Sequence, residues 1–298
     1  EAHLLGYANF AEVSLANKMA TSPDHVVTFL RDLAQRARPS AERDVQEMRS
    51  FAAEHLGLND PQPWDWTFIG EKLKEARYAF SEQEVKQYFT APKVLEGLFK
   101  IVETLFDVHL AKDTAPVWKP EVQFYRIERA GQLIGQFYLD PGARAGKRGG
   151  AWMNYLLTGN RDASIGPRTP HLGLICGNLT PSVGDQPALL NHREVETIFH
   201  EFGHLLHHLC GEAEVKGLNG VNVPWDFVEL PSQILENWCW DRESLDLFAR
   251  HHETGEPIPQ DLFDKMLAAK NFQSGMQTLR QIEFSLFDML LHSEHDPA

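Results

Sequence analysis

The stretch TIFHEFGHLLHH, residues 197–208, places one glutamate and four histidines within an apolar run. On a helix, His200 and His204 are neighbours on one face and can bind one metal ion together. Glu201 lies beside that face, where its carboxylate can reach a water molecule on the metal. Zinc with three protein ligands lowers the pKa of such a water to about 7. The spacing therefore predicts a hydrolytic zinc site with Glu201 as general base.

A third ligand has to come from a second segment, and the candidate is WDFVELPSQILENW, residues 225–238. We expect Asp226 to cap a helix here, and Pro231 lies early enough in that helix to be tolerated. Glu229 is the predicted third ligand, because a carboxylate within the apolar run FVELP is poorly placed for solvent.

Four further polar side chains accompany these candidate ligands. Gln233 and Glu236 share a helix face with Glu229, and either could orient a ligand histidine through its second ring nitrogen. His207 and His208 are interpreted as packing or surface residues, because two ligands from the first helix suffice.

The ligand helix is predicted independently of its histidines. Asn191 is a good N-cap, and Glu194 three residues later completes a capping-box pattern. Apolar residues then recur at helical spacing as far as Leu209. The two histidines therefore lie on a helix, as the metal chemistry requires.

The preceding sequence predicts helices and then a small sheet. Pro39 and Ser40 are expected to break one helix from the next, and a loop is expected at residues 57–63. The predicted helices cover residues 23–38, 41–55, 67–80 and 92–110. Strands are predicted at residues 122–127, 133–140 and 172–176, the first two joined by a turn at 129–132. Helices return at residue 191 and continue to residue 292.

Composition excludes several classes of protein. The 298 residues are 43% hydrophobic and 23% charged, as is usual for globular proteins. A net charge of −14 argues against binding nucleic acid. No run of apolar residues is long enough for a membrane span, so no membrane partner is expected. The three cysteines are widely spaced and indicate a reduced, cytoplasmic protein.

Several motifs together resemble the thimet oligopeptidase family of zinc metallopeptidases. Besides the HEFGH motif, they are GQFYLD at 135–140, KRGGAWM at 147–153, PALL at 187–190, ELPSQ at 229–233, ENW at 236–238, KMLAAK at 265–270 and LRQ at 279–281. The resemblance implies one Zn²⁺ per chain, bound by His200, His204 and Glu229, with Glu201 as general base. It implies a mainly α, gluzincin-type catalytic region with a small sheet or hairpin beside a substrate channel, and short peptides as substrates.

The same resemblance gives an expected domain layout. Family members are longer at both ends, so residues 1–298 are expected to be a fragment of a single catalytic domain. Residues 1–117 would be helical, 118–180 a small β region with loops, and 181–298 helical with the zinc site. The tyrosine-rich stretch that supplies oxyanion donors in the family is expected beyond residue 298.

Several alternatives stay open on the sequence alone. The leading function is a zinc endopeptidase for short peptides, and a dipeptidyl carboxypeptidase of the same family is the nearest alternative. A zinc-stabilised module that binds peptides without cleaving them is another, and a helical scaffold with an accidental motif is the last. The strand at residues 136–139 is expected near the site, either as an edge that pairs with peptide or as a plain hairpin strand. The oligomeric state is not indicated.

Overall fold

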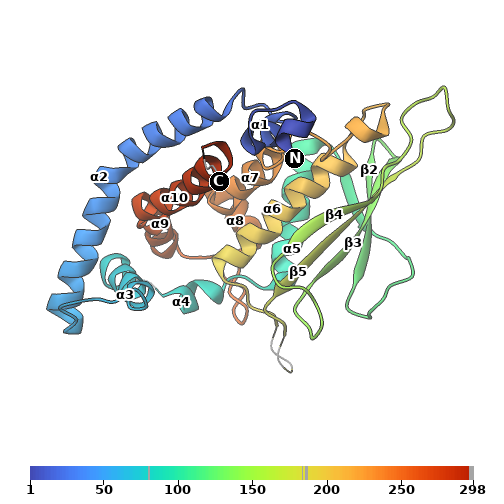
Figure 1. The fold of residues 1–298 in the computed structure, drawn as a ribbon. Coiled ribbons are helices and arrows are strands. Elements are labelled where there is room, and N and C mark those ends of the chain that lie inside the picture. The colour runs from blue at the N-terminus through green and yellow to red at the C-terminus, as the bar shows by residue number, and fades with distance from the viewer. Residues whose placement is uncertain (80, 183, 185–186, 295–298) are drawn as a thin grey trace. The chain divides into compact units, whose positions relative to one another are not determined.

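The computed structural model describes residues 1–79, 81–182, 184 and 187–294. The chain forms two compact units (Figure 1), one of Glu1–Phe80, Pro224–Asp226 and Asp264–Ala298, the other of Ser81–Val223 and Phe227–Phe263. The predicted class is confirmed, because helices predominate in the described part of the chain and one five-stranded sheet accompanies them there. Among the described residues, no helix combines the length and apolar character that crossing a bilayer requires.

The first unit is helical. Its elements are η1 (Ala2–Leu5), α1 (Phe10–Leu15), α2 (Pro23–Leu56), α3 (Trp66–Tyr78) and α10 (Ser274–Ser293). The helix α9 (Gln260–Ala269) begins in one unit and ends in the other. A buried cluster of Met48, Ala52, Ile69 and Leu73 forms the core between α2 and α3.

The predicted helix break at Pro39 is wrong, because α2 continues through it. A proline inside a helix costs about 3 kcal/mol, since it removes one backbone hydrogen bond and crowds the preceding turn. Packing against α10 opposes this cost. A Cβ atom on Gly275 would lie only 2.6 Å from the backbone N of Ala41, so α10 touches the α2 backbone directly after the proline.

The second unit combines helices with the sheet. Its helices are α4 (Glu82–Lys86), α5 (Ala91–Phe106), α6 (His192–Leu209), η2 (Lys216–Leu218), α7 (Leu230–Glu236), η3 (Asn237–Cys239) and α8 (Arg242–Phe248). Its strands are β1 (His109–Lys112), β2 (Gln123–Arg129), β3 (Gln132–Gly142), β4 (Trp152–Leu157) and β5 (His171–Leu179).

The strand order is β1-β2-β3-β5-β4, with β3 and β5 parallel and the other pairs antiparallel. The predicted hairpin is confirmed: Ala130 and Gly131 connect β2 to β3 with φ of 49° and 73°, as a type I′ turn requires. The third predicted strand is also confirmed as β5. The sequence did not predict β1 and β4, which are the two edges of the sheet.

Of the two alternatives for residues 136–139, the free edge for peptide is wrong and the plain hairpin strand is confirmed. These residues belong to β3, whose two sides pair with β2 and β5. The edge strand near the ligand helix is β4, which pairs with β5 on one side. Within the described ranges, no strand pairs with its other side.

Helix α6 packs on β3, β4 and β5 (Figure 1). Glycines permit this close approach, since a Cβ on Gly173 would lie 2.4 Å from Cδ1 of Leu205, and one on Gly135 would lie 2.8 Å from Cδ2 of Leu209. Aromatic contacts extend the packing: the ring of Phe202 lies 5.6 Å from that of Phe137. The helix is thereby packed closely on the sheet.

Candidate metal centre

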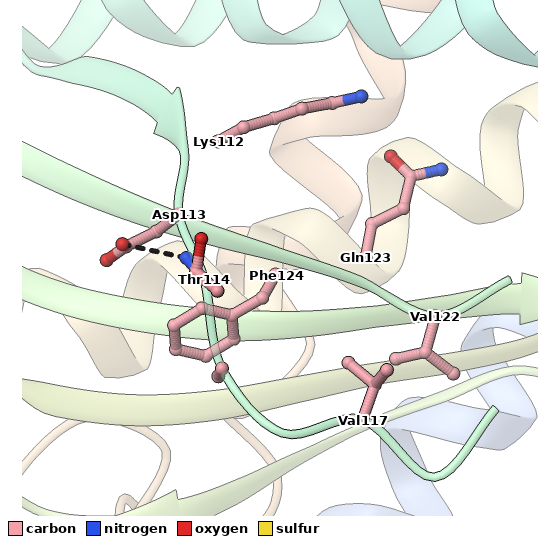
Figure 2. Close-up of a pocket in the computed structure, with 8 residues that line it drawn as sticks. Lys112, Asp113, Thr114, Val117, Val122, Gln123 and Phe124 are labelled. Atoms are coloured by element: carbon pink, nitrogen blue, oxygen red, sulfur yellow. Dashed lines mark hydrogen bonds between the residues drawn. The ribbon is translucent and has the colours of Figure 1, made fainter. Parts of the chain in front are cut away.

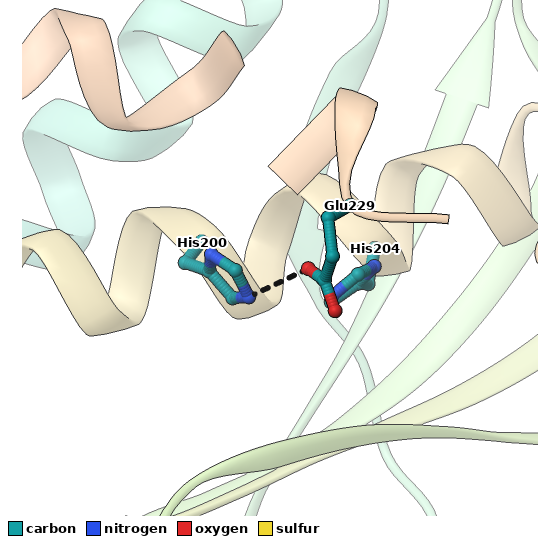
Figure 3. A group of neighbouring side chains, drawn as sticks. All are labelled: His200, His204 and Glu229. Carbon is teal, nitrogen blue, oxygen red and sulfur yellow. Dashed lines mark ion pairs between the residues drawn. The ribbon is translucent and has the colours of Figure 1, made fainter. Parts of the chain in front are cut away.

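The structure brings His200, His204 and Glu229 together, with one ligand atom from each lying within 4.8 Å of the others (Figure 3). Oε2 of Glu229 lies 3.2 Å from Nε2 of His200 and 3.1 Å from Nε2 of His204. The two imidazole rings are nearly perpendicular, with centroids 4.9 Å apart. In Figure 3, Glu229 reaches from its own segment toward the two histidines on α6.

This donor set fits zinc. Zinc binds imidazole nitrogen and carboxylate oxygen at about 2.0–2.2 Å, so tetrahedral ligand atoms lie about 3.4 Å apart. The two nitrogen–oxygen separations of 3.2 and 3.1 Å are close to that value. Two histidines and one carboxylate also leave a fourth position for water or substrate, as catalytic zinc sites require.

Helix α6 forms where the sequence predicts it. The Asn191 side chain accepts the backbone N–H of Glu194, and the Glu194 carboxylate accepts the N–H of Asn191, so the capping box is complete. The apolar positions of the helix are buried against the sheet and against neighbouring helices, and the ring of Phe199, for example, lies 5.5 Å from that of Phe248 on α8. His200 and His204 are only partly buried, so their imidazoles stay accessible to a metal ion.

The predicted cap of α7 is wrong. Instead of capping the helix, the carboxylate of Asp226 accepts the backbone N–H groups of Met19 and Ala20 at 2.9 and 3.0 Å. The helix begins later, with Glu229 as its N-cap residue and Pro231 in its first turn, where proline is tolerated. This short helix places the Glu229 side chain beside α6.

Of the two predicted orienting residues, Glu236 contacts one of the candidate ligands. Its Oε1 lies 2.6 Å from Nδ1 of His200. Gln233 has an exposed side chain on the same helix. The second nitrogen of His200 is thus held by a carboxylate, an arrangement that orients metal-binding histidines and increases their basicity.

Glu201 is buried beside the cluster, with 7% of its surface exposed. Burial raises the pKa of its carboxyl above the ordinary value, and the negative charge of Glu229 adds to this effect. The neighbouring His200 ring and a backbone hydrogen bond from Met153 act in the opposite direction. Because Met153 belongs to β4, the glutamate lies between the ligand helix and the edge strand.

The remaining histidines of the motif lie outside the cluster, as expected. His208 is fully buried, and its Nε2 lies 3.1 Å from the carbonyl oxygen of Leu157 at the end of β4. The ring centroid of His207 lies 6.5 Å from that of Phe227. Burial lowers the pKa of both imidazoles. His208 is therefore a packing residue that ties α6 to β4.

Sequence reasoning missed two contributors to the site. Strand β4 has no clear apolar alternation, and its position depends on pairing with distant β5. Gly203 separates the two histidines, and a Cβ there would lie 2.5 Å from Cα of Ser232. A glycine within a long apolar helix was the available signal, since it costs about 1 kcal/mol relative to alanine.

A separate pocket of about 260 Å³ lies at the other edge of the sheet, between the end of β1 and the start of β2 (Figure 2). Its lining includes Asp113, whose carboxylate accepts the backbone N–H of Thr114 at 2.8 Å and the side-chain N–H of Gln136 at 2.8 Å. The pocket is smaller than most ligand sites. Strand β3 separates it from β5 and β4, so it is not part of the metal centre.

One protein family and several known proteins match this sequence over essentially its whole length. The sequence model of Peptidase family M3 matches residues 1–298. Oligopeptidase A of Salmonella typhimurium is 46% identical over 99% of this chain, which covers 44% of that protein. The organellar oligopeptidase A of Arabidopsis thaliana is 42% identical over 100% of the chain, which covers 39% of it. A dipeptidyl carboxypeptidase of Escherichia coli is 33% identical over 98% of the chain, which covers 43% of it. The chain thus spans less than half the length of these relatives.

Proposed function

The chain belongs to peptidase family M3, and on that premise we propose that it holds the zinc centre of an oligopeptidase. His200, His204 and Glu229 are the proposed ligands, and Glu201 is the proposed general base. The observation that carries the proposal is the convergence of these three ligand atoms beside a buried glutamate. We also propose that residues 1–298 form part of a single catalytic domain, because the family match extends over all of them.

The roles of the side chains follow from their positions. Zinc, when bound, supplies a Lewis acid that polarises the peptide carbonyl and acidifies water. Glu201 takes the proton from the attacking water and returns it to the leaving amine. Its buried environment suits this role, because burial raises the pKa of its carboxyl toward the working pH. Glu236 holds the Nδ1 proton of His200, which keeps Nε2 free to bind the metal.

The proposed substrate is a short peptide bound in extended form along β4. Tyr155, Leu156 and Leu157 of this strand are exposed, and the edge is next to Glu201 through Met153. Pairing along a strand edge uses main-chain hydrogen bonds, so it tolerates many peptide sequences. A cytoplasmic location stays a prediction, since one of the plant relatives is organellar.

The test is cleavage of an internally quenched fluorescent peptide by the zinc-loaded protein, with Glu201→Gln measured in parallel. General-base catalysis contributes about 10²- to 10⁴-fold, so we expect the variant to lose at least about a hundredfold in kcat while retaining zinc. Saturable peptide binding by wild type without turnover would favour the peptide-binding module instead. Unchanged turnover in Glu201→Gln would contradict the assigned base.

A dipeptidyl carboxypeptidase is the second candidate, favoured by the 33% identity with such an enzyme. Both activities would use the same ligands and base, so the centre does not distinguish them. Mass spectrometry of the products from a peptide blocked at its N-terminus does. Internal cleavage supports the oligopeptidase, whereas stepwise release of C-terminal dipeptides supports the alternative.

A further inference from the structure

Ser232 lies in the first turn of α7 with its side chain entirely buried. Its Oγ lies 2.8 Å from Oε2 of Glu229 and 2.9 Å from the backbone oxygen of the same residue. A hydroxyl has one proton to donate, so these two oxygens share it. The hydroxyl therefore acts on the side chain that provides the third proposed ligand.

The oxygen that Ser232 contacts is the one that faces both histidines. Oε2 of Glu229 lies 3.2 Å from Nε2 of His200 and 3.1 Å from Nε2 of His204. The Glu229 side chain is 52% exposed, so packing alone does not restrict its rotamers. Holding a free glutamate side chain in one rotamer costs conformational entropy. A buried hydroxyl next to Oε2 reduces that cost before any metal binds.

Gly203 has no side chain, and this allows Ser232 to pack directly against α6. A Cβ on Gly203 would lie 2.5 Å from Cα of Ser232 and 2.6 Å from the backbone oxygen of Pro231. Contacts this short do not occur in folded proteins, so a side chain at position 203 would force α7 away. Since Gly203 lies between His200 and His204, the two helices touch at the level of the proposed ligands.

We propose that Ser232 is a positioning residue, which holds Oε2 of Glu229 toward the two histidines. The absence of a side chain at Gly203 allows Ser232 to lie close enough to α6 to do so. The inference rests on the proposed function, in which these residues bind zinc. It deepens that function by assigning the preorganisation of the third ligand to two residues that do not themselves contact the metal.

The experiment measures zinc affinity by competition with a chromogenic chelator for wild type, Ser232→Ala, Glu229→Ala and the double variant. Residues that orient metal ligands contribute about 10- to 100-fold in affinity, so Ser232→Ala should weaken zinc binding by about tenfold. Glu229→Ala should weaken it further. If the serine acts through Glu229, adding Ser232→Ala to Glu229→Ala should change nothing more.

Ser244→Ala is the matched control. Ser244 is also buried, in the first turn of α8, and its Oγ lies 2.9 Å from the Asp241 carboxylate. Its loss removes the same kind of hydrogen bond away from the metal centre. We expect comparable destabilisation in urea with unchanged zinc affinity.

A second pair of variants tests the close contact between Gly203 and Ser232, and this test does not depend on the folding of Ser232→Ala. Gly203→Ala should lower zinc affinity by at least tenfold, because it displaces α7. Gly97→Ala is its control, since a Cβ there would lie 2.5 Å from Cβ of Phe248 in a contact between α5 and α8. That variant should be destabilised but keep its zinc affinity.

The outcomes separate the inference from the function. If wild type binds zinc and either Ser232→Ala or Gly203→Ala binds it with the same affinity, the inference is overturned. The proposed function is then unaffected. A tenfold loss that persists in the Glu229→Ala background also overturns the inference, because the serine would then act by another route. Failure of wild type to bind zinc contradicts the proposed function itself, and the inference with it.

Discussion

Nδ1 of His200 lies 2.6 Å from Oε1 of Glu236, while Nε2 of the same ring faces Glu229. The short contact sets a carboxylate against Nδ1, so the other nitrogen, Nε2, is the one directed at the proposed metal position. The two carboxylates of one short helix therefore act on opposite sides of a single imidazole.

Removing Glu236 should weaken the metal centre without removing a ligand. We expect Glu236→Ala to lower zinc affinity by about 10- to 100-fold, because His200 loses the partner that fixes its tautomer and orientation. Chelator competition measures the loss. Glu243→Ala, an exposed glutamate on α8, is the control and should bind zinc like wild type. Equal affinity in both variants would remove Glu236 from the site.

Peptide binding along β4 predicts a two-residue periodicity. In an antiparallel pair, every second backbone N–H of the peptide points toward the strand. N-methylation at those positions should raise KM by about three- to tenfold, since each removes a hydrogen bond worth about 1 kcal/mol. Methylation at the intervening positions is the internal control. A series without alternation would exclude strand pairing.

Asp140 anchors the glycine-rich loop that leads into β4. Only 1% of its surface is exposed, and Arg144, Lys147 and Trp118 donate to its carboxylate. Burial acts to raise its pKa, but these hydrogen bonds hold it well below the usual range. Asp140→Ala leaves Lys147 buried without that partner, so we expect a loss of about 3–5 kcal/mol in urea unfolding.

Asp288→Ala serves as the comparison for this loss. The carboxylate of Asp288 is mostly exposed and pairs with His292 on the surface of α10. An exposed pair of this kind contributes under about 1 kcal/mol. Similar stabilities for the two variants would mean that the Asp140 network contributes little to the fold.

His171 should make stability depend on pH. Burial lowers its pKa to about 4, while an unfolded histidine titrates near 6.5. The unfolded chain therefore takes up a proton as pH falls from about 6.5 to about 4, and the folded chain loses stability over that window at up to about 1.4 kcal/mol per pH unit. Above about pH 6.5 this contribution is constant.

The measurement compares urea unfolding at about pH 7.5 and about pH 5 for metal-free wild type and His171→Gln. Wild type should lose about 2 kcal/mol more than the variant over this interval. His109→Gln, which alters an exposed histidine of the same unit, should behave like wild type. A loss of equal size in wild type and His171→Gln would assign the pH dependence to other groups.

The parts of the site that the sequence predicts are those governed by local rules. Asn191 and Glu194 begin α6 through contacts three residues apart, and helical spacing then places His200 and His204 on one face. The turn at Ala130 and Gly131 is equally local. Glu229 was predicted because its apolar neighbours were expected to shield it from solvent, and that reason is wrong, since its side chain is 52% exposed. Its carboxylate nevertheless lies next to both histidines.

The errors occur where distant residues decide. Asp226 has the chemistry of a helix cap, but the N–H groups of Met19 and Ala20 occupy its carboxylate. Pro39 breaks helices locally, but contact with α10 near Gly275 supports α2 through it. Strand β4 exists because β5 is available to pair with it. None of these partners is close in sequence, so local patterns carry no trace of them.

Strand β4 is attached to helix α6 at both ends, through Met153 to Glu201 and through Leu157 to His208. The strand and the proposed metal centre are therefore linked through the same helix. Residues of a peptide paired with that edge would be spaced about 3.3 Å apart. The peptide bond next to Glu201 would then be determined by its distance, in residues, from the peptide's end. The cleavage position of such a peptide would then depend on its register along β4 more than on its amino-acid sequence.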